Sequence, residues 1–277
     1  MAPIIIKGQS FVEVKYHYID YNVEKEDQEI YRKIANGIDL KGDMDSADWF
    51  KFLMEENIEE HVPQIKSVEK HSSRFVYLQA AADGILNSDG TQTKQNSIKT
   101  RILIDKIREI VSKGQSVIVY FDYYASLYII DSMLKEANLR CKILHSTGEH
   151  VLTDQDVTEG KCKQIPHVIL GTRASSESAS YYFINNVIFF HIPTVPSTMI
   201  QLIGRITRKN TLYPDDLNCY IFRSENIDLY KLMVVSAKTY QLELTQGEER
   251  NIPPDYKRAM SKNDSLDRMK KLLLWQK

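Results

Sequence analysis

The stretch from Asn186 to Pro193 reads Asn-Val-Ile-Phe-Phe-His-Ile-Pro and is nearly continuous in apolar residues. A run of this kind, closed by proline, is typical of a strand that is buried on both faces of a parallel sheet. Comparable runs occupy residues 116–121, 140–144, 168–174 and 217–222. Between the first two, residues 123–138 repeat apolar side chains at helical spacing. This strand–helix–strand order predicts an α/β fold with a parallel sheet, flanking helices and right-handed crossovers.

A phosphate-directed pattern follows at residues 201–208, which read Gln-Leu-Ile-Gly-Arg-Ile-Thr-Arg. Arg205 and Arg208 lie three residues apart, so a helical turn brings both guanidinium groups to one side. Each guanidinium is permanently charged and presents a planar fork of donors that suits phosphate oxygens. With Gln201 and Gly204 they form a set that can face a triphosphate. The alternative interpretation is the solvated basic start of a helix.

Polar residues also follow other predicted strands. Ligands of open parallel sheets bind at the carboxyl ends of the strands, and both Thr172 and residues 201–208 fall in segments that follow strands. Tyr123 comes just after the run at 116–121, where an aromatic ring can stack on a base, although core packing is the simpler explanation. Three histidines lie at strand ends without a carboxylate or serine at a diagnostic spacing, which favours core histidines over general bases; they are His145, His167 and His191.

The order of these segments resembles the second RecA-like lobe of superfamily 2 helicases and translocases, and most closely the SWI/SNF-type branch. The resemblance covers roughly residues 11–222. It is carried by a strand at 117–121 similar to motif IV, by Gly-Thr-Arg-Ala at 171–174 similar to the start of motif V, and by residues 201–208 similar to motif VI. The alternating run at 12–21, the Gln and Tyr of residues 27–34, and Ser97-Ile98-Lys99-Thr100 at a helix start are similar to the segments that lead into this lobe.

The resemblance implies roles for several of these residues. Arg205 and Arg208 would stabilise the transferring γ-phosphate of ATP as arginine fingers, and Gln201 would couple nucleotide binding to closure of the two lobes. Gly204 and Glu177 would lie at the nucleotide. ATP and Mg²⁺ would be bound mainly by the first lobe. Thr172, and in the stacking interpretation Tyr123, would contact nucleic acid, with DNA expected and RNA as the alternative.

Two departures bear on the mechanism. Residues 174–180 read Ala-Ser-Ser-Glu-Ser-Ala-Ser, whereas motif V of the SWI/SNF branch is rich in glycine, and serine is costly where the backbone needs a positive φ. The pattern GxxxxGK[ST] does not occur in the sequence, and no acidic DExx segment follows an apolar strand. We therefore expect this chain alone to be inactive and its lobe 1 to be supplied in cis or in trans. Of these we favour a fragment of a longer protein, because Ala2 after Met1 is a common start of expressed segments.

Composition indicates a water-soluble chain inside the cell, cytoplasmic or nuclear. The sequence has 277 residues, a net charge of −1 and three cysteines without a CxxC pattern, and it shows no signal segment. No metal site is expected on this chain. A viral or phage source is a further hypothesis, based on the divergent, tyrosine-rich sequence.

The C-terminal end is basic, and its basic tail cluster consists of Arg268, Lys270 and Lys271. These residues are expected to neutralise nucleic-acid phosphates, or else to form the solvated face of an amphipathic helix. We divide the chain into an interlobe strand and helical section (1–96), a RecA-like lobe (97–224) and a helical extension (225–277). Two functions remain open: the second lobe of an ATP-dependent DNA helicase or translocase, and a degenerate nucleic-acid-binding or scaffold module that no longer hydrolyses ATP.

Overall fold

The structure, a computed structural model, describes residues 14–35, 78–85, 96–145, 165–173, 181, 183–193, 195–207, 211–213 and 215–235. Within this part the chain forms a six-stranded sheet in the order β1-β6-β5-β2-β4-β3. The strands are β1 (Val14–Asp20), β2 (Val117–Tyr120), β3 (Lys142–His145), β4 (His167–Gly171), β5 (Asn186–Phe189) and β6 (Leu217–Arg223). Every pairing in the sheet is parallel, which confirms the predicted α/β fold.

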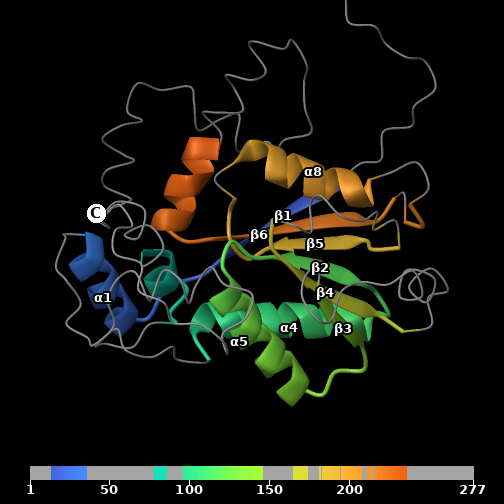
Figure 1. Ribbon diagram of the computed structural model, residues 1–277, viewed down its shortest axis with the longest axis horizontal. Coiled ribbons are helices and arrows are strands. Elements are labelled where there is room, and N and C mark those ends of the chain that lie inside the picture. The colour runs from blue at the N-terminus through green and yellow to red at the C-terminus, as the bar shows by residue number, and fades with distance from the viewer. Residues whose placement is uncertain are drawn as a thin grey trace, which may run out of the picture.

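Helices cover both faces of the sheet (Figure 1). Helices α4 (Ile98–Ser112) and α5 (Tyr124–Glu136) lie on one face, and α8 (Pro196–Ile206) lies on the other beside the helix of residues 227–235. Strand β2 shows how the layers are divided, because successive side chains of a strand point to opposite faces. Val117 and Val119 belong to the core under α4 and α5, whereas Ile118 and Tyr120 belong to the core under α8.

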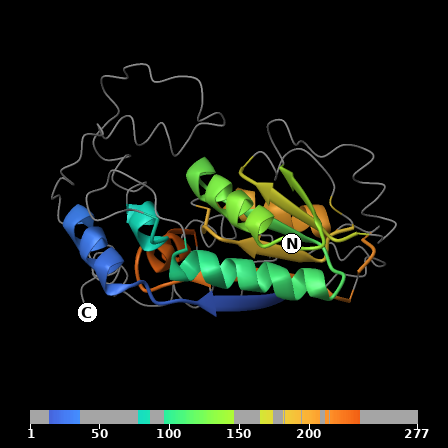
Figure 2. The ribbon, with the colours of Figure 1, turned by 90° about the horizontal axis from the view of Figure 1, so that it is seen from below.

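The carboxyl ends of the strands share one edge of the sheet, because all strands are parallel. Two further helices lie at this edge, α1 (Lys25–Ala35) and the helix of residues 78–82, and the arrow of β1 points toward them (Figure 2). The carboxyl edge is therefore flanked by two helices from the N-terminal third of the sequence.

Helix α4 begins and ends through local chemistry. The side chain of Ser97 caps its first turn by accepting a hydrogen bond from the amide of Thr100. After its last turn Gly114 adopts a φ of +70°, a conformation that glycine reaches without a steric penalty. None of the described helices is long and apolar enough to cross a membrane.

The predicted division of the chain into three parts stays a prediction. Strand β1 comes from the section assigned to residues 1–96, yet it pairs with β6 along its whole length, from Val14 opposite Leu217 to Asp20 opposite Arg223. The interlobe strand is thus part of the same sheet as the RecA-like core.

Candidate functional site

Thr172 lies at the carboxyl edge of the sheet, directly after β4, as expected. It is buried, and its hydroxyl donates a hydrogen bond of 3.4 Å to the hydroxyl of Tyr124, the first residue of α5. Its neighbour Arg173 is exposed.

Tyr123 lies at the same edge but is only 9 % exposed. The edge of its ring packs against His191 at a centroid distance of 5.2 Å, and the ammonium group of Lys231 lies 5.4 Å from its centroid. Burial raises the pKa of its phenol to about 12. These contacts support core packing, the simpler of the two interpretations, over stacking on a base.

Helix α8 carries the second set of candidates away from that edge. It begins with Pro196 in its first turn and buries Met199, Leu202 and Ile203 against the sheet. At its far end the carbonyl of Arg205 accepts a hydrogen bond from the amide of Tyr181, five residues before β5 begins. Residues 201–207 follow β5 as expected, but they lie away from Thr172, because α8 starts at the carboxyl edge and runs back over the face of the sheet (Figure 1).

The outer side of α8 has an open strip. Gln201 and Gly204 are exposed one turn apart, and Arg205 beside them is half-buried. A Cβ built on Gly204 would meet no described atom within 4 Å. We call Gln201, Gly204 and Arg205 the α8 strip. The remaining candidates fall outside the described residues, namely Arg208, Glu177, Arg268, Lys270 and Lys271.

A buried ionic network at the carboxyl edge was not predicted from the sequence. At its centre lies Lys99, which is 1 % exposed and whose ammonium group lies 2.7 Å from a carboxylate oxygen of Asp83 and 3.4 Å from one of Asp228. The same ammonium group lies 4.4 Å from the ring centroid of Phe190 and 5.0 Å from that of Tyr21. Two carboxylates and two ring faces thus compensate for burying this charge.

Asp83 is the most connected member of the network. In addition to Lys99 it accepts hydrogen bonds from Gln79 at 3.0 Å, from Ser126 at 3.3 Å and from the ring of His191 at 2.6 Å. Burial alone would raise the pKa of its carboxyl, but His191 and Lys99 outweigh burial and hold that pKa well below its ordinary value.

Asp228 completes this side of the network after β6. Its carboxylate accepts hydrogen bonds from the hydroxyl of Tyr21 and from the side-chain amide of Gln79. Burial, followed by the charge of Asp228, raises the pKa of Tyr21 well above its ordinary value, so this phenol stays a proton donor.

A second buried pair adjoins the first through His191. Lys231 lies 2.7 Å from the carboxylate of Asp122, which also accepts a hydrogen bond of 2.8 Å from Tyr120. The backbone amide of Asp122 donates to Nδ1 of His191 at 2.8 Å. Burial opposes the charge of Lys231, but the carboxylate of Asp122 outweighs it and raises the pKa of this lysine above its ordinary value.

Sequence spacing could not reveal these pairs. His191 and Asp83 are 108 positions apart, and Lys99 and Asp228 are 129 positions apart. The one local signal is Lys99 in the first turn of α4, after Ser97 and Ile98. A lysine in the first turn of an amphipathic helix does not by itself indicate a buried charge.

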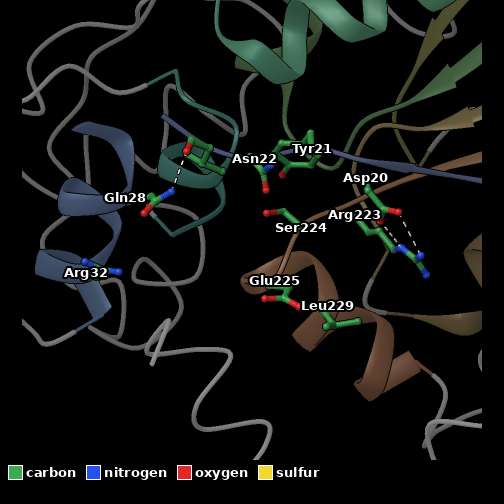
Figure 3. A pocket seen from close by; sticks show the side chains of 10 residues that line it. Asp20, Tyr21, Asn22, Gln28, Arg32, Arg223, Ser224, Glu225 and Leu229 are labelled. Carbon is green, nitrogen blue, oxygen red and sulfur yellow. Dashed lines mark hydrogen bonds and ion pairs between the residues drawn. The ribbon is translucent and has the colours of Figure 1, made fainter. Parts of the chain in front are cut away.

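A hollow of about 720 Å³ opens beside the network, where β1 and β6 end (Figure 3). Acidic and basic groups face it in balance: Asp20 and Glu225 on one hand, Arg32 and Arg223 on the other. Asp20 and Arg223 also pair with each other across the two strands. The described residues that line the hollow therefore give it no excess positive charge of the kind that selects a phosphate.

The fold and the site define a RecA-like α/β lobe. Residues 99–210 match the family described as the helicase conserved C-terminal domain, so this stretch of the chain is similar to that family. This stretch contains the network lysine, Thr172 and the α8 strip. No curated protein sequence matches the chain.

Two solved structures share the fold. The C-terminal part of the Fun30 ATPase domain is 15 % identical, with 94 % of this chain and 96 % of that one covered and a TM-score of 0.57. The Sulfolobus solfataricus SWI2/SNF2 ATPase core in complex with dsDNA is 12 % identical, with 93 % of this chain covered and a TM-score of 0.52. This chain spans half the length of that core.

Proposed function

We propose that this chain is the second lobe of an ATP-dependent DNA helicase or translocase. The observation that carries the proposal is the α8 strip, which lies on the outer side of a helix within the stretch that is similar to the helicase C-terminal domain. A guanidinium and a side-chain amide beside an open glycine are suited to phosphate oxygens brought by another domain.

A first lobe would bind most of ATP and the Mg²⁺, and the phosphates of that ATP would face the α8 strip. ATP supplies a terminal phosphoanhydride bond for cleavage, and Arg205 and Arg208 would donate hydrogen bonds to the oxygens on which charge develops. Gln201 would bind the nucleotide when the lobes close, and the open space at Gly204 admits a group close to the helix backbone. Glu177 keeps its expected role at the nucleotide.

DNA would bind at the other candidate surface, the carboxyl edge of the sheet. Thr172 at the end of β4 has a hydroxyl that suits a backbone phosphate, and the basic tail cluster would add sequence-independent attraction. That a relative of the same fold was solved with dsDNA supports DNA over RNA. Separate surfaces for nucleotide and nucleic acid are what a motor requires.

The test is Arg205→Ala in the complete protein, with lobe 1 supplied in cis or in trans. Loss of an arginine finger lowers turnover by about 10³-fold while nucleotide affinity changes little, because the finger acts on the transition state. Arg108→Ala is the matched control, because Arg108 is an exposed arginine of α4, on the opposite face of the sheet. Turnover within about twofold of wild type in Arg205→Ala would refute a phosphate-directed role, since one charge-assisted contact is worth more than that.

A non-hydrolysing nucleic-acid-binding or scaffold module is the second candidate. The serine-rich segment at 174–180 favours it, because glycine permits close backbone approach that serine hinders. This candidate predicts DNA binding without DNA-stimulated turnover even when a first lobe is present.

A further inference from the structure

His191 lies between the two candidate surfaces. It belongs to the segment that connects β5 to α8, five residues before Pro196 at the start of the helix. Its side chain is fully buried, and its ring packs near Phe190, Phe121 and Tyr123 at centroid distances of 4.9, 6.1 and 5.2 Å. The ring is thus fixed by packing as well as by hydrogen bonds.

Both ring nitrogens of His191 are used, and their roles are fixed by their partners. The amide of Asp122 can only donate, so Nδ1 accepts and Nε2 carries the hydrogen that it donates to Asp83. The bond to Asp122 reaches a backbone group. It therefore holds the turn after β2, where Tyr123 lies, whatever side chain stands at position 122.

The connection to α8 is short and stiff. The amide of Phe190 donates a hydrogen bond to the carbonyl of Tyr120, and this bond continues the pairing of β5 and β2 to the edge of the sheet. Beyond that bond the ring of His191 joins the two strand ends. Pro193 and Pro196 each restrict their own φ, one before α8 and one at its start. The β2 turn and the start of α8 are therefore linked by two hydrogen bonds and a short connection.

We infer that His191 is a positioning residue that couples the nucleic-acid edge of this lobe to the α8 strip through its bond to the amide of Asp122. The inference rests on the proposed function. Asp83, held by Lys99 and Ser126, fixes the ring on its other side. If His191 only packed in the core, its loss would affect folding alone. If it couples the two surfaces, its loss also reduces the stimulation of ATP turnover by DNA.

Two substitutions separate the nitrogens. The side-chain oxygen of His191→Asn lies where Nδ1 lies and can still accept from the amide of Asp122, but it leaves Asp83 without this donor. The side-chain amide of His191→Gln reaches the position of Nε2 and can still donate to Asp83, but it leaves the Asp122 amide without an acceptor. Ser126→Ala is the matched control, because it removes a different hydrogen bond of Asp83 and leaves both bonds of His191 in place.

The measurement is the ratio of turnover with a blunt DNA duplex to turnover without DNA, in the complete protein with both lobes. This ratio does not depend on the fraction of folded enzyme, so a purely structural defect leaves it unchanged. We expect His191→Gln to lower it about tenfold, which corresponds to about 1.4 kcal/mol, the scale of one hydrogen bond. His191→Asn and Ser126→Ala should keep the wild-type ratio.

A ratio in His191→Gln less than about threefold below that of His191→Asn would overturn the inference, as would an equal fall in Ser126→Ala. If His191→Gln does not fold, His191→Asn still tests the inference: a ratio more than about threefold below wild type overturns it. The proposed function fails separately, if Arg205→Ala keeps its turnover or if DNA does not stimulate the wild-type protein.

Discussion

Replacing Gly204 by alanine should make this lobe more stable and the complete protein slower. Gly204 is exposed near the end of α8, and an added Cβ meets no described atom within 4 Å. Alanine in a helix is favoured over glycine by up to about 1 kcal/mol, and by roughly half of that near a helix end. We therefore expect a gain of about 0.5–1 kcal/mol, which for a chain of this size raises Tm by roughly 1–4 °C.

Turnover should change in the opposite direction. If the nucleotide or its lobe approaches the backbone at Gly204, a methyl group there blocks the approach, and turnover with lobe 1 present should fall about tenfold or more. Thermal unfolding of the purified chain and steady-state ATP turnover of the complete protein test the two halves.

Gly114→Ala is the control for this pair of measurements. Gly114 also has open space around its Cβ position, but its φ is +70°. Alanine at this position should therefore destabilise the chain and leave turnover per folded molecule unchanged. If Gly204→Ala gained stability but kept wild-type turnover, nothing would approach α8 at this position, and Gly204 would have no place in a nucleotide site.

Three further outcomes are expected. Lys99→Met should destabilise the chain by about 3–5 kcal/mol in urea unfolding, because it leaves Asp83 and Asp228 buried without their cation; a destabilisation below about 1 kcal/mol would contradict the network. Because the folded pKa of Asp83 is depressed, its contribution to stability is present above about pH 4 and is lost as pH falls toward the folded pKa; the free energy of unfolding of Asp83→Asn should therefore fall less steeply than that of wild type below pH 4. Reversal of the basic tail cluster to glutamate should weaken DNA binding and reduce its log–log salt slope by roughly 0.7–0.9 for each phosphate that is no longer neutralised, and an unchanged slope would leave the cluster no role at DNA.

The strands of the sheet could be predicted because each of them is encoded by a short, continuous run of apolar residues. The run at 217–222 became β6 almost residue for residue, and that at 186–193 became β5 plus the buried segment that follows it. Fully buried parallel strands require continuous apolar sequence, so the pattern is local. The family resemblance is confirmed by the helicase C-terminal domain match and by the shared fold.

The site was predictable only in part, for two physical reasons. The path of α8 over the face of the sheet depends on burial of its apolar side in the core that also holds Ile118 and Leu217, and no local pattern encodes this path. The pairs of Lys99 with Asp228 and of Lys231 with Asp122 join residues more than 100 positions apart. At the level of sequence each of these lysines looks like a solvated charge. The roles assigned to the α8 strip remain predictions.

The pairing of β1 with β6 has a consequence for how the chain is made. Strand β1 leaves the ribosome about 200 residues before its partner β6, which at ordinary rates of synthesis is roughly 10–40 s. During that interval the backbone groups of β1 have no pairing partner. After β6 is made, its edge stays uncovered until β1 docks on it. Closing so long a loop late makes this step slow. A chain that lacks residues 14–20 should therefore expose the edge of β6 permanently and aggregate through it.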